Sequence, residues 1–272
     1  MRVRNWFAAG RIAEMEAPIL SIENVSKTFR RPGHAPVKAV NAVSLTVARG
    51  ETVALVGESG SGKSTLGRIA LGLLRPDSGG VVLEGKVLGD LSPDELRRAR
   101  VAMQPIFQDA SSSLNPRRSA RELMAQALRG DAHDTEALSA ALLDRVGLSP
   151  GRDYLPRFPH EISGGQRQRL AIARALAMNP RLIIADEPLS GADVSIRGQV
   201  LNLLLDIKEE RGVAYLMITH DISIARHFAD RVAVMQHGVI VETGPAAQVL
   251  TSPSHPYTRQ LVAAVPVLET TR

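Results

Sequence analysis

The pattern of apolar and polar residues predicts an antiparallel start to the chain, followed by a strand, a loop and a helix. Residues 18–25 and 39–47 alternate apolar and polar side chains, which is typical of half-buried antiparallel strands. Residues 51–56 are mostly apolar and predict a strand that runs straight into a glycine-rich loop. A helix is predicted over Lys63–Leu74, because the pattern stops just before Pro76.

The middle of the chain is predicted to be mostly helical. The segment Ser92–Glu95 matches a capping box with proline at the first helical position, so a helix should begin there. Residues from about 111 to 165 have mostly helical patterns, with helices expected over 120–128 and 135–146. This part of the chain therefore has the character of a helical insertion.

Strands and helices alternate again over the last third of the chain. Residues 182–185 are wholly apolar, as in a strand that is buried on both faces of a parallel sheet. The other elements predicted here are helices over 166–178, 196–210 and 222–228 and strands over 213–219 and 231–235. Alternation of this kind around a glycine loop favours an α/β fold with a mainly parallel sheet.

Composition narrows the classes of function. The 272 residues suit one large domain or one domain with a subdomain, and 44% hydrophobic and 22% charged residues are typical of a soluble globular protein. The absence of cysteine excludes disulfides, thiolate metal sites and a catalytic thiol. The net charge of +5 fits a nucleotide, a nucleic acid or an anionic membrane surface, or simply a solvated arginine-rich surface. No stretch approaches the roughly 20 apolar residues that cross a bilayer, so at a membrane another chain would do the spanning.

The first 16 residues fail as a signal peptide, because Arg11 interrupts a short apolar patch. They are expected to be a disordered lead or a mis-called start, since the recognisable pattern begins just after Met15. A short amphipathic segment at a membrane surface is the other interpretation.

Residues 57–65 form a complete phosphate-binding loop. It consists of Gly57, Glu58, Ser59, Gly60, Ser61, Gly62, Lys63, Ser64 and Thr65. Glycines let backbone N–H groups point at phosphate oxygens, and the following helix adds its positive end. Lys63 is expected to reach the β- and γ-phosphates of ATP, and Ser64 to bind Mg²⁺. The alternative is a structural glycine-rich turn between a strand and a helix, which the complete motif in this strand–loop–helix context disfavours.

Two further segments carry candidate chemistry. The apolar strand over 182–185 ends in Asp186, aimed at Mg²⁺ or its water shell, and Glu187, which can polarise the attacking water. Downstream of the loop, Ser163, Gly164, Gly165 and Gln166 open a helix as a second phosphate site would. Because one nucleotide does not need two such helix starts from one subunit, the second site is expected to serve the ATP of another chain.

The order of these motifs resembles the nucleotide-binding subunit of ATP-binding cassette (ABC) transporters, whose signature is Leu-Ser-Gly-Gly-Gln; Ile162 takes the place of its leucine. The resemblance covers roughly residues 18–266. It implies a P-loop NTPase core with a mainly parallel sheet, an N-terminal antiparallel β subdomain and an inserted α-helical subdomain. It further implies an ATPase domain over 17–251, with the helical subdomain at about 90–165, and a C-terminal extension over 252–272.

The resemblance also assigns roles to residues outside these motifs. Gln108 resembles the Q-loop glutamine, which touches the metal and the attacking water, and His220 resembles the switch histidine that contacts the γ-phosphate. Phe29 lies where the family places an aromatic side chain on adenine. Asp193 resembles the D-loop aspartate that couples two sites, in a local sequence, Ser190–Asp193, that departs from the common Ser-Ala-Leu-Asp.

Several segments resemble the oligopeptide, dipeptide and nickel importer group. They are Ser112–Arg117, the residues after Asp193, and Ser254-His255-Pro256-Tyr257-Thr258. This group implies a heterodimer with a sister ATPase, with a homodimer as the alternative, docked on two membrane permeases at the cytoplasmic face of the cell membrane. An extracytoplasmic solute-binding protein would feed the permeases, and the sequence does not reveal the cargo.

The competing function is a soluble ATPase of the same family that acts on nucleic acid or ribosomes. Such proteins usually carry two cassettes or a long coiled-coil insertion, and the sequence has neither. A kinase or GTPase with the same loop would leave Ser163–Gln166 unexplained.

Overall fold

Two β-sheets organise the fold in the computed structural model, which describes residues 17–109, 113–131, 134–189 and 194–264. The first sheet is antiparallel and contains, in the order β2-β1-β4-β5, the strands β1 (Leu20–Phe29), β2 (Val37–Val47), β4 (Ser78–Leu83) and β5 (Lys86–Val87). The second contains, in the order β10-β9-β3-β8-β7-β6, the strands β3 (Thr52–Val56), β6 (Met103–Ile106), β7 (Leu182–Asp186), β8 (Ala214–Thr219), β9 (Arg231–Gln236) and β10 (Val239–Pro245). Only β10 pairs antiparallel in this second sheet, so the expected α/β fold with a mainly parallel sheet is confirmed.

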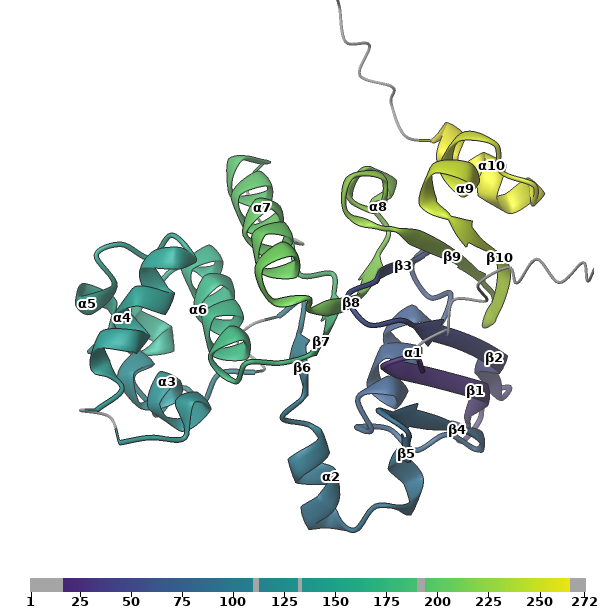
Figure 1. Cartoon of the computed structure of the whole chain (residues 1–272). Helices are drawn as coiled ribbons and strands as arrows, with labels where there is room; N and C mark the ends of the chain where they lie inside the picture. Colours follow the sequence, from purple (N-terminus) through teal and green to yellow (C-terminus); the bar gives the residue numbers. More distant parts are fainter. Residues whose placement is uncertain (1–16, 110–112, 132–133, 190–193, 265–272) are drawn as a thin grey trace, which may run out of the picture.

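The helices lie between the sheets and around the parallel one. Their bounds are α1 (Lys63–Ala70), α2 (Pro93–Ala99), α3 (Ala120–Leu128), α4 (Glu136–Arg145), α5 (Gly151–Tyr154), α6 (Gly164–Ala177), α7 (Val194–Arg211), α8 (Ile222–Phe228), α9 (Ala246–Thr251) and α10 (Pro256–Ala263), with 3-10 turns at Leu88–Asp90 and Pro159–Glu161. Helices α3 to α6 gather in a lobe of their own beside β6 and β7 (Figure 1). Within the described ranges, no helix has both the length and the apolar character that crossing a bilayer requires.

Helix α1 packs between the two sheets because its apolar face meets both. Leu66 and Ile69 are buried in one cluster with Ile22 of β1 and Ile218 of β8. Gly67 permits this close approach, since a Cβ there would lie 2.5 Å from Ile218 Cδ1. The helix that follows the glycine loop is thereby fixed to the parallel sheet.

The opposite face of the parallel sheet packs against α6 and α7. Ile183 of β7 and Met217 of β8 are buried with Leu170 of α6 and Leu204 of α7. The helical lobe is therefore attached to the sheet through α6, the helix that begins at the candidate signature.

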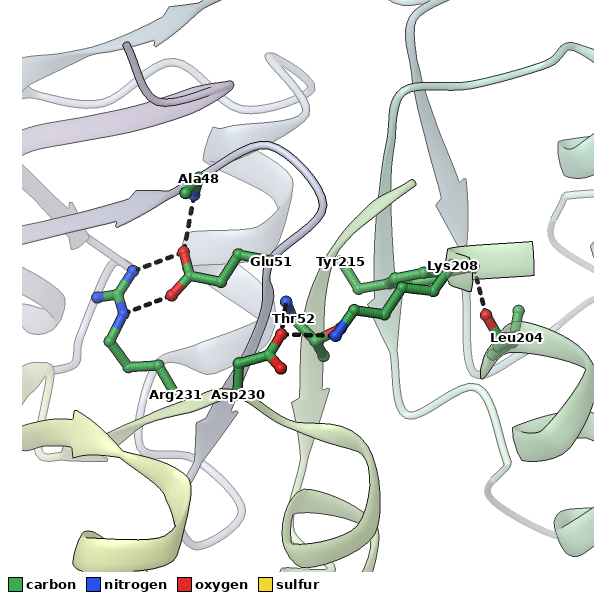
Figure 2. A network of polar contacts seen from close by, with 8 residues as sticks. All are labelled: Ala48, Glu51, Thr52, Leu204, Lys208, Tyr215, Asp230 and Arg231. Atoms are coloured by element: carbon green, nitrogen blue, oxygen red, sulfur yellow. Dashed lines mark hydrogen bonds and ion pairs between the residues drawn. The ribbon is translucent and has the colours of Figure 1, made fainter. Parts of the chain in front are cut away.

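Polar contacts tie the amino end of β3 to β9 and α7 (Figure 2). Arg231 makes a two-point contact with Glu51, with nitrogen–oxygen distances of 2.8 and 3.1 Å. Asp230 Oδ2 accepts the buried Thr52 N–H at 2.7 Å and the Lys208 ammonium at 2.6 Å. These contacts hold the amino end of β3 in place. The glycine loop follows the carboxyl end of the same strand.

Several elements differ from the sequence prediction. The helix predicted over Lys63–Leu74 ends at Ala70, because Gly72 adopts a left-handed φ of 63° and Arg100 donates to the carbonyls of Leu71 and Gly72. The sequence pattern did not predict strands β4, β5, β6 and β10, or helices α5, α9 and α10. β4 begins Ser-Gly-Gly and β6 contains a proline, and both are extended through pairing with strands distant in sequence.

We expect Asp230→Ala to destabilise the protein more than Lys208→Ala. Both substitutions remove the ion pair, which is worth roughly 0.2–1 kcal/mol at a partly exposed site. Only Asp230→Ala also leaves the buried Thr52 N–H without its acceptor, which costs about 1–3 kcal/mol more. Urea unfolding of the two variants measures the difference, and equal losses would contradict this account of the strand's anchorage.

Candidate functional site

Four segments with candidate residues follow the carboxyl ends of neighbouring parallel strands. The loop over Gly57–Thr65 follows β3, Glu187 follows β7, His220 follows β8, and the exposed Gln108 comes shortly after β6. The strands pair in register, β3 with β8, β8 with β7 and β7 with β6. Their carboxyl ends therefore share one edge of the sheet, the usual place for a ligand in an open α/β fold.

Two glycines allow the loop to lie against neighbouring backbone. Gly57 has a φ of 152°, and a Cβ there would lie 2.2 Å from the carbonyl oxygen of Met235. Gly62 has a φ of 109°, and its Cβ would lie 2.1 Å from the carbonyl oxygen of Ala39. No other residue fits at either position without moving β9 or β2.

The side chain of Lys63 is buried within the loop, with the residue only 5% exposed. Its ammonium donates to the carbonyl oxygens of Gly57 and Glu58, both at 2.7 Å. Burial lowers the pKa of Lys63, and the nearby carboxylates of Glu187 and Asp186 oppose that shift. A positive charge is thus held at the loop, facing two acidic residues.

Ser64 and Asp186 bring two oxygen ligands together at the start of α1. The Ser64 hydroxyl donates to Asp186 Oδ1 at 3.0 Å. Burial raises the pKa of Asp186, with Glu187 adding to the shift and the Ser64 hydrogen bond opposing it. A hydroxyl beside a carboxylate suits Mg²⁺, which binds through few protein oxygens together with water and phosphate. In the described part of the chain, no three His, Cys, Asp or Glu side chains form a metal cage, so the fit is to a metal shared with a phosphate ligand.

Glu187 and His220 form a contact pair beside this site. The Glu187 Oε1 to His220 Nδ1 distance is 2.9 Å, with the histidine side chain 61% and the glutamate side chain 19% exposed. Glu187 has a left-handed φ of 47°, an uncommon conformation for a residue with a side chain, and its N–H donates to the Ile218 carbonyl at 2.8 Å. Backbone strain of this kind concentrates at functional sites.

The candidate signature lies in the helical lobe, away from the glycine loop. Ser163 caps α6 in a capping box with Gln166, whose side-chain amide donates to the Tyr154 hydroxyl at 3.2 Å. Arg167 donates to the Ile162 carbonyl at 2.7 Å and steadies the turn before the helix. Figure 1 shows the lobe that contains α6 and the helix α1 on different sides of β7 and β8. One chain therefore does not bring the signature to its own loop.

The structure does not connect Phe29 with the residues around Lys63 and Glu187, and it does not describe Asp193. Phe29 is the last residue of β1, opposite Val37, and its exposed fraction is 45%. Asp193 lies outside the described residues, so the predicted D-loop role stays a prediction.

Gln168 is a residue that the sequence reasoning missed. It lies one turn inside α6, and its side-chain amide donates to the Phe107 carbonyl at 3.1 Å and the Pro188 carbonyl at 2.8 Å. It thus connects the residue before Gln108 with the residue after Glu187. A polar residue inside a motif-bearing helix was the only available signal, and it does not say what the side chain reaches.

Two family profiles match the sequence. The profile described as "ABC transporter" matches residues 40–190, and the profile described as "Oligopeptide/dipeptide transporter, C-terminal region" matches residues 241–272. Among curated proteins, the chain is similar to the glutathione import ATP-binding protein GsiA of Escherichia coli (strain K12), with 48% identity over 265 residues. That match covers 94% of this chain and 42% of GsiA, so the chain spans about two fifths of the relative's length.

Two solved structures have the same fold. The dimeric ATP-binding cassette MJ0796, in a post-hydrolysis state with ADP and Pi, matches with a TM-score of 0.74 and 33% identity, over 84% of this chain and 98% of that chain. The cbiO1 protein from Clostridium perfringens, part of the cbiONQ transporter complex, matches with a TM-score of 0.73 and 28% identity, over 87% of this chain and 92% of that chain.

The left-handed backbone at Glu187 leads to a stability test. Glu187→Gly and Glu187→Ala both remove the carboxylate, but only glycine relieves the strain, so the glycine variant should be more stable by about 1 kcal/mol. Asp186, in the extended strand β7, should show the opposite order, with glycine less stable than alanine by roughly 0.5–1 kcal/mol. Urea unfolding of the four variants measures their free energies of unfolding. If glycine and alanine rank in the same order at both positions, the backbone at Glu187 is not strained.

Proposed function

The chain belongs to the ABC transporter family, and we propose that it binds and hydrolyses ATP as the motor subunit of an importer for peptides or a related small solute such as nickel. The observation that carries the proposal is the meeting of Lys63, Ser64, Asp186 and Glu187 at one edge of the parallel sheet. This arrangement supplies a cation for phosphate, ligands for a metal and a carboxylate for water.

Binding of ATP rests on the loop and its helix. Backbone N–H groups within the loop over Gly57–Thr65, other than those of Glu58 and Ser61, and the N-terminus of α1 cradle the phosphates. Lys63 neutralises the β- and γ-phosphates. Phe29, exposed at the end of β1, stacks on adenine. Ser64, Asp186 and Gln108 would hold Mg²⁺, which when bound neutralises phosphate charge.

Glu187 is the general base in the proposed hydrolysis. Its carboxylate accepts a proton from water as the water oxygen bonds to the γ-phosphorus and the bond to the ADP oxygen breaks. His220 holds that carboxylate through the 2.9 Å contact, and we propose that it also contacts the γ-phosphate. Glu187 follows β7 directly and has a left-handed backbone there.

We further propose that two chains complete each site. Residues Ser163–Gln166 of one chain contact the γ-phosphate on the loop of the other, because the lobe separates them within a single chain. Asp193 is proposed to couple the two sites. The related cassette MJ0796 was solved as a dimer, which supports this assembly. A heterodimer with a sister ATPase is the proposed form, with a homodimer as the alternative.

The proposed partners are two membrane permeases, fed by an extracytoplasmic solute-binding protein, with this chain at the cytoplasmic face of the membrane. The support is the C-terminal profile over 241–272 and the similarity to a glutathione import protein, glutathione being a short peptide. No observation favours a soluble ATPase acting on nucleic acid, so no nucleic-acid partner is proposed. The division into an ATPase domain over 17–251 and an extension over 252–272 stays a prediction.

Glu187→Gln tests the proposed mechanism. In the complex with its partner subunits, this variant should keep its affinity for MgATP and lose at least about a hundredfold in steady-state hydrolysis, as expected when a general base is removed. Glu209→Gln, an exposed position on α7, is the matched control and should hydrolyse at the wild-type rate. Undiminished hydrolysis by Glu187→Gln would exclude the assigned base.

Uptake of a radiolabelled short peptide tests the transport function. In cells that lack the chromosomal copy, the wild-type chain should restore uptake and Lys63→Ala should not, because the phosphates lose their buried cation. Lys86→Ala, exposed on β5, should restore it fully. If peptide uptake does not depend on this chain and nickel uptake does, the transported solute is nickel and not a peptide.

A further inference from the structure

The C-terminal helix α10 reaches the phosphate-binding loop. The backbone N–H of Glu58 donates to the Tyr257 hydroxyl at 2.9 Å, although 199 positions separate the two residues in sequence. Tyr257 is 6% exposed and is buried in one cluster with Ala54 and Val56 of β3, the strand that leads into the loop. The contact therefore lies at the root of the loop, where the chain leaves the sheet.

The position of Tyr257 is set by neighbouring contacts. His255 caps α10 by accepting the Tyr257 N–H on Nδ1 at 3.2 Å. The carboxylate of Glu242 in β10 accepts the N–H groups of Ser254 and His255 at 2.7 and 3.0 Å. Because β10 pairs with β9 and β9 with β3, these contacts join the first turn of α10 to the sheet that carries the loop.

The residue held by Tyr257 also orients the lysine of the loop. The Glu58 carbonyl accepts the Lys63 ammonium at 2.7 Å and the Ser61 N–H at 3.2 Å. On the other side, the Ser61 carbonyl accepts the Gly238 N–H at 2.9 Å. The loop is thus anchored through one residue by α10 and through another by the β9–β10 turn. Burial raises the pKa of Tyr257, so its hydroxyl stays neutral at physiological pH.

We propose that Tyr257 is a positioning residue for the phosphate-binding loop, so that helix α10 contributes to the affinity for the nucleotide. This inference rests on the proposed binding of ATP at the loop. With the Glu58 N–H directed to Tyr257, the backbone from Ser59 onward is held in the turn that a phosphate group would enter. The segment Ser254–Thr258, which resembles the importer group in sequence, would then serve to position the phosphate-binding loop.

Tyr257→Phe tests the proposal, because it removes the hydroxyl and keeps the buried ring. In the full-length chain, the dissociation constant for MgATP, measured by displacement of a fluorescent analogue, should rise about threefold to tenfold, the effect of one net hydrogen bond. In the complex with partner subunits, KM for ATP should rise by a similar factor while kcat stays within twofold.

Tyr215→Phe is the matched control. Tyr215 is also buried, and its hydroxyl donates to the Leu204 carbonyl at 3.0 Å (Figure 2). It pairs with Thr52 at the amino end of β3, whereas the loop follows the carboxyl end. This variant should lower the melting temperature and leave the dissociation constant within twofold. An unchanged constant for Tyr257→Phe, or equal increases in both variants, would overturn the proposal.

If Tyr257→Phe does not fold, hydrogen exchange of the wild-type chain tests the proposal instead. MgATP should slow exchange in peptides over 256–263 as well as over 57–65, with α4, residues 136–145, as the internal reference. Slowing over 57–65 alone would overturn this inference and leave the proposed function intact. Failure of the wild-type chain to bind MgATP would overturn the proposed function, and this inference with it.

Discussion

The in-register pairing of four parallel strands is the constraint on which the site depends. Because β6, β7, β8 and β3 run in one direction, the segments that follow them leave the sheet at one edge. The glycine loop, the acidic pair and the histidine meet there without any of them being close in sequence. The apolar clusters on both faces of this sheet hold the strands in that order. The geometry of the site therefore depends on the packing of the core.

The edge of the parallel sheet where the site lies contains features that are unfavourable for folding. Lys63 is buried with a lowered pKa, Asp186 is half-buried with a raised pKa, and Glu187 keeps a left-handed backbone. Each feature opposes folding, and each suits a phosphate ligand and a metal, whose charges complement the lysine and the carboxylates. The surrounding core and the contacts at the amino end of β3 offset that cost.

Helix α6 links the lobe to the site. It begins at Ser163, and its Gln168 holds the carbonyls next to Gln108 and Glu187, while Arg174 donates to the Ser113 carbonyl. A displacement of the lobe would therefore act on both segments through one helix. This connection agrees with a machine in which the lobe of one chain closes on the loop of another.

The amino-acid sequence alone was enough to predict the fold class, most of the strands and helices, and the candidate residues for nucleotide chemistry. Apolar periodicity and motifs such as Gly57–Ser64 are local, and a local pattern can be read without knowing what packs against it. That β4 and β6 are strands became visible only in the folded chain, since their extended form comes from pairing with partners distant in sequence. The tertiary structure alone decided that Tyr257 reaches Glu58 and that Gln168 joins two segments of the site, because hydrogen bonds between residues far apart in the chain depend on how the core packs.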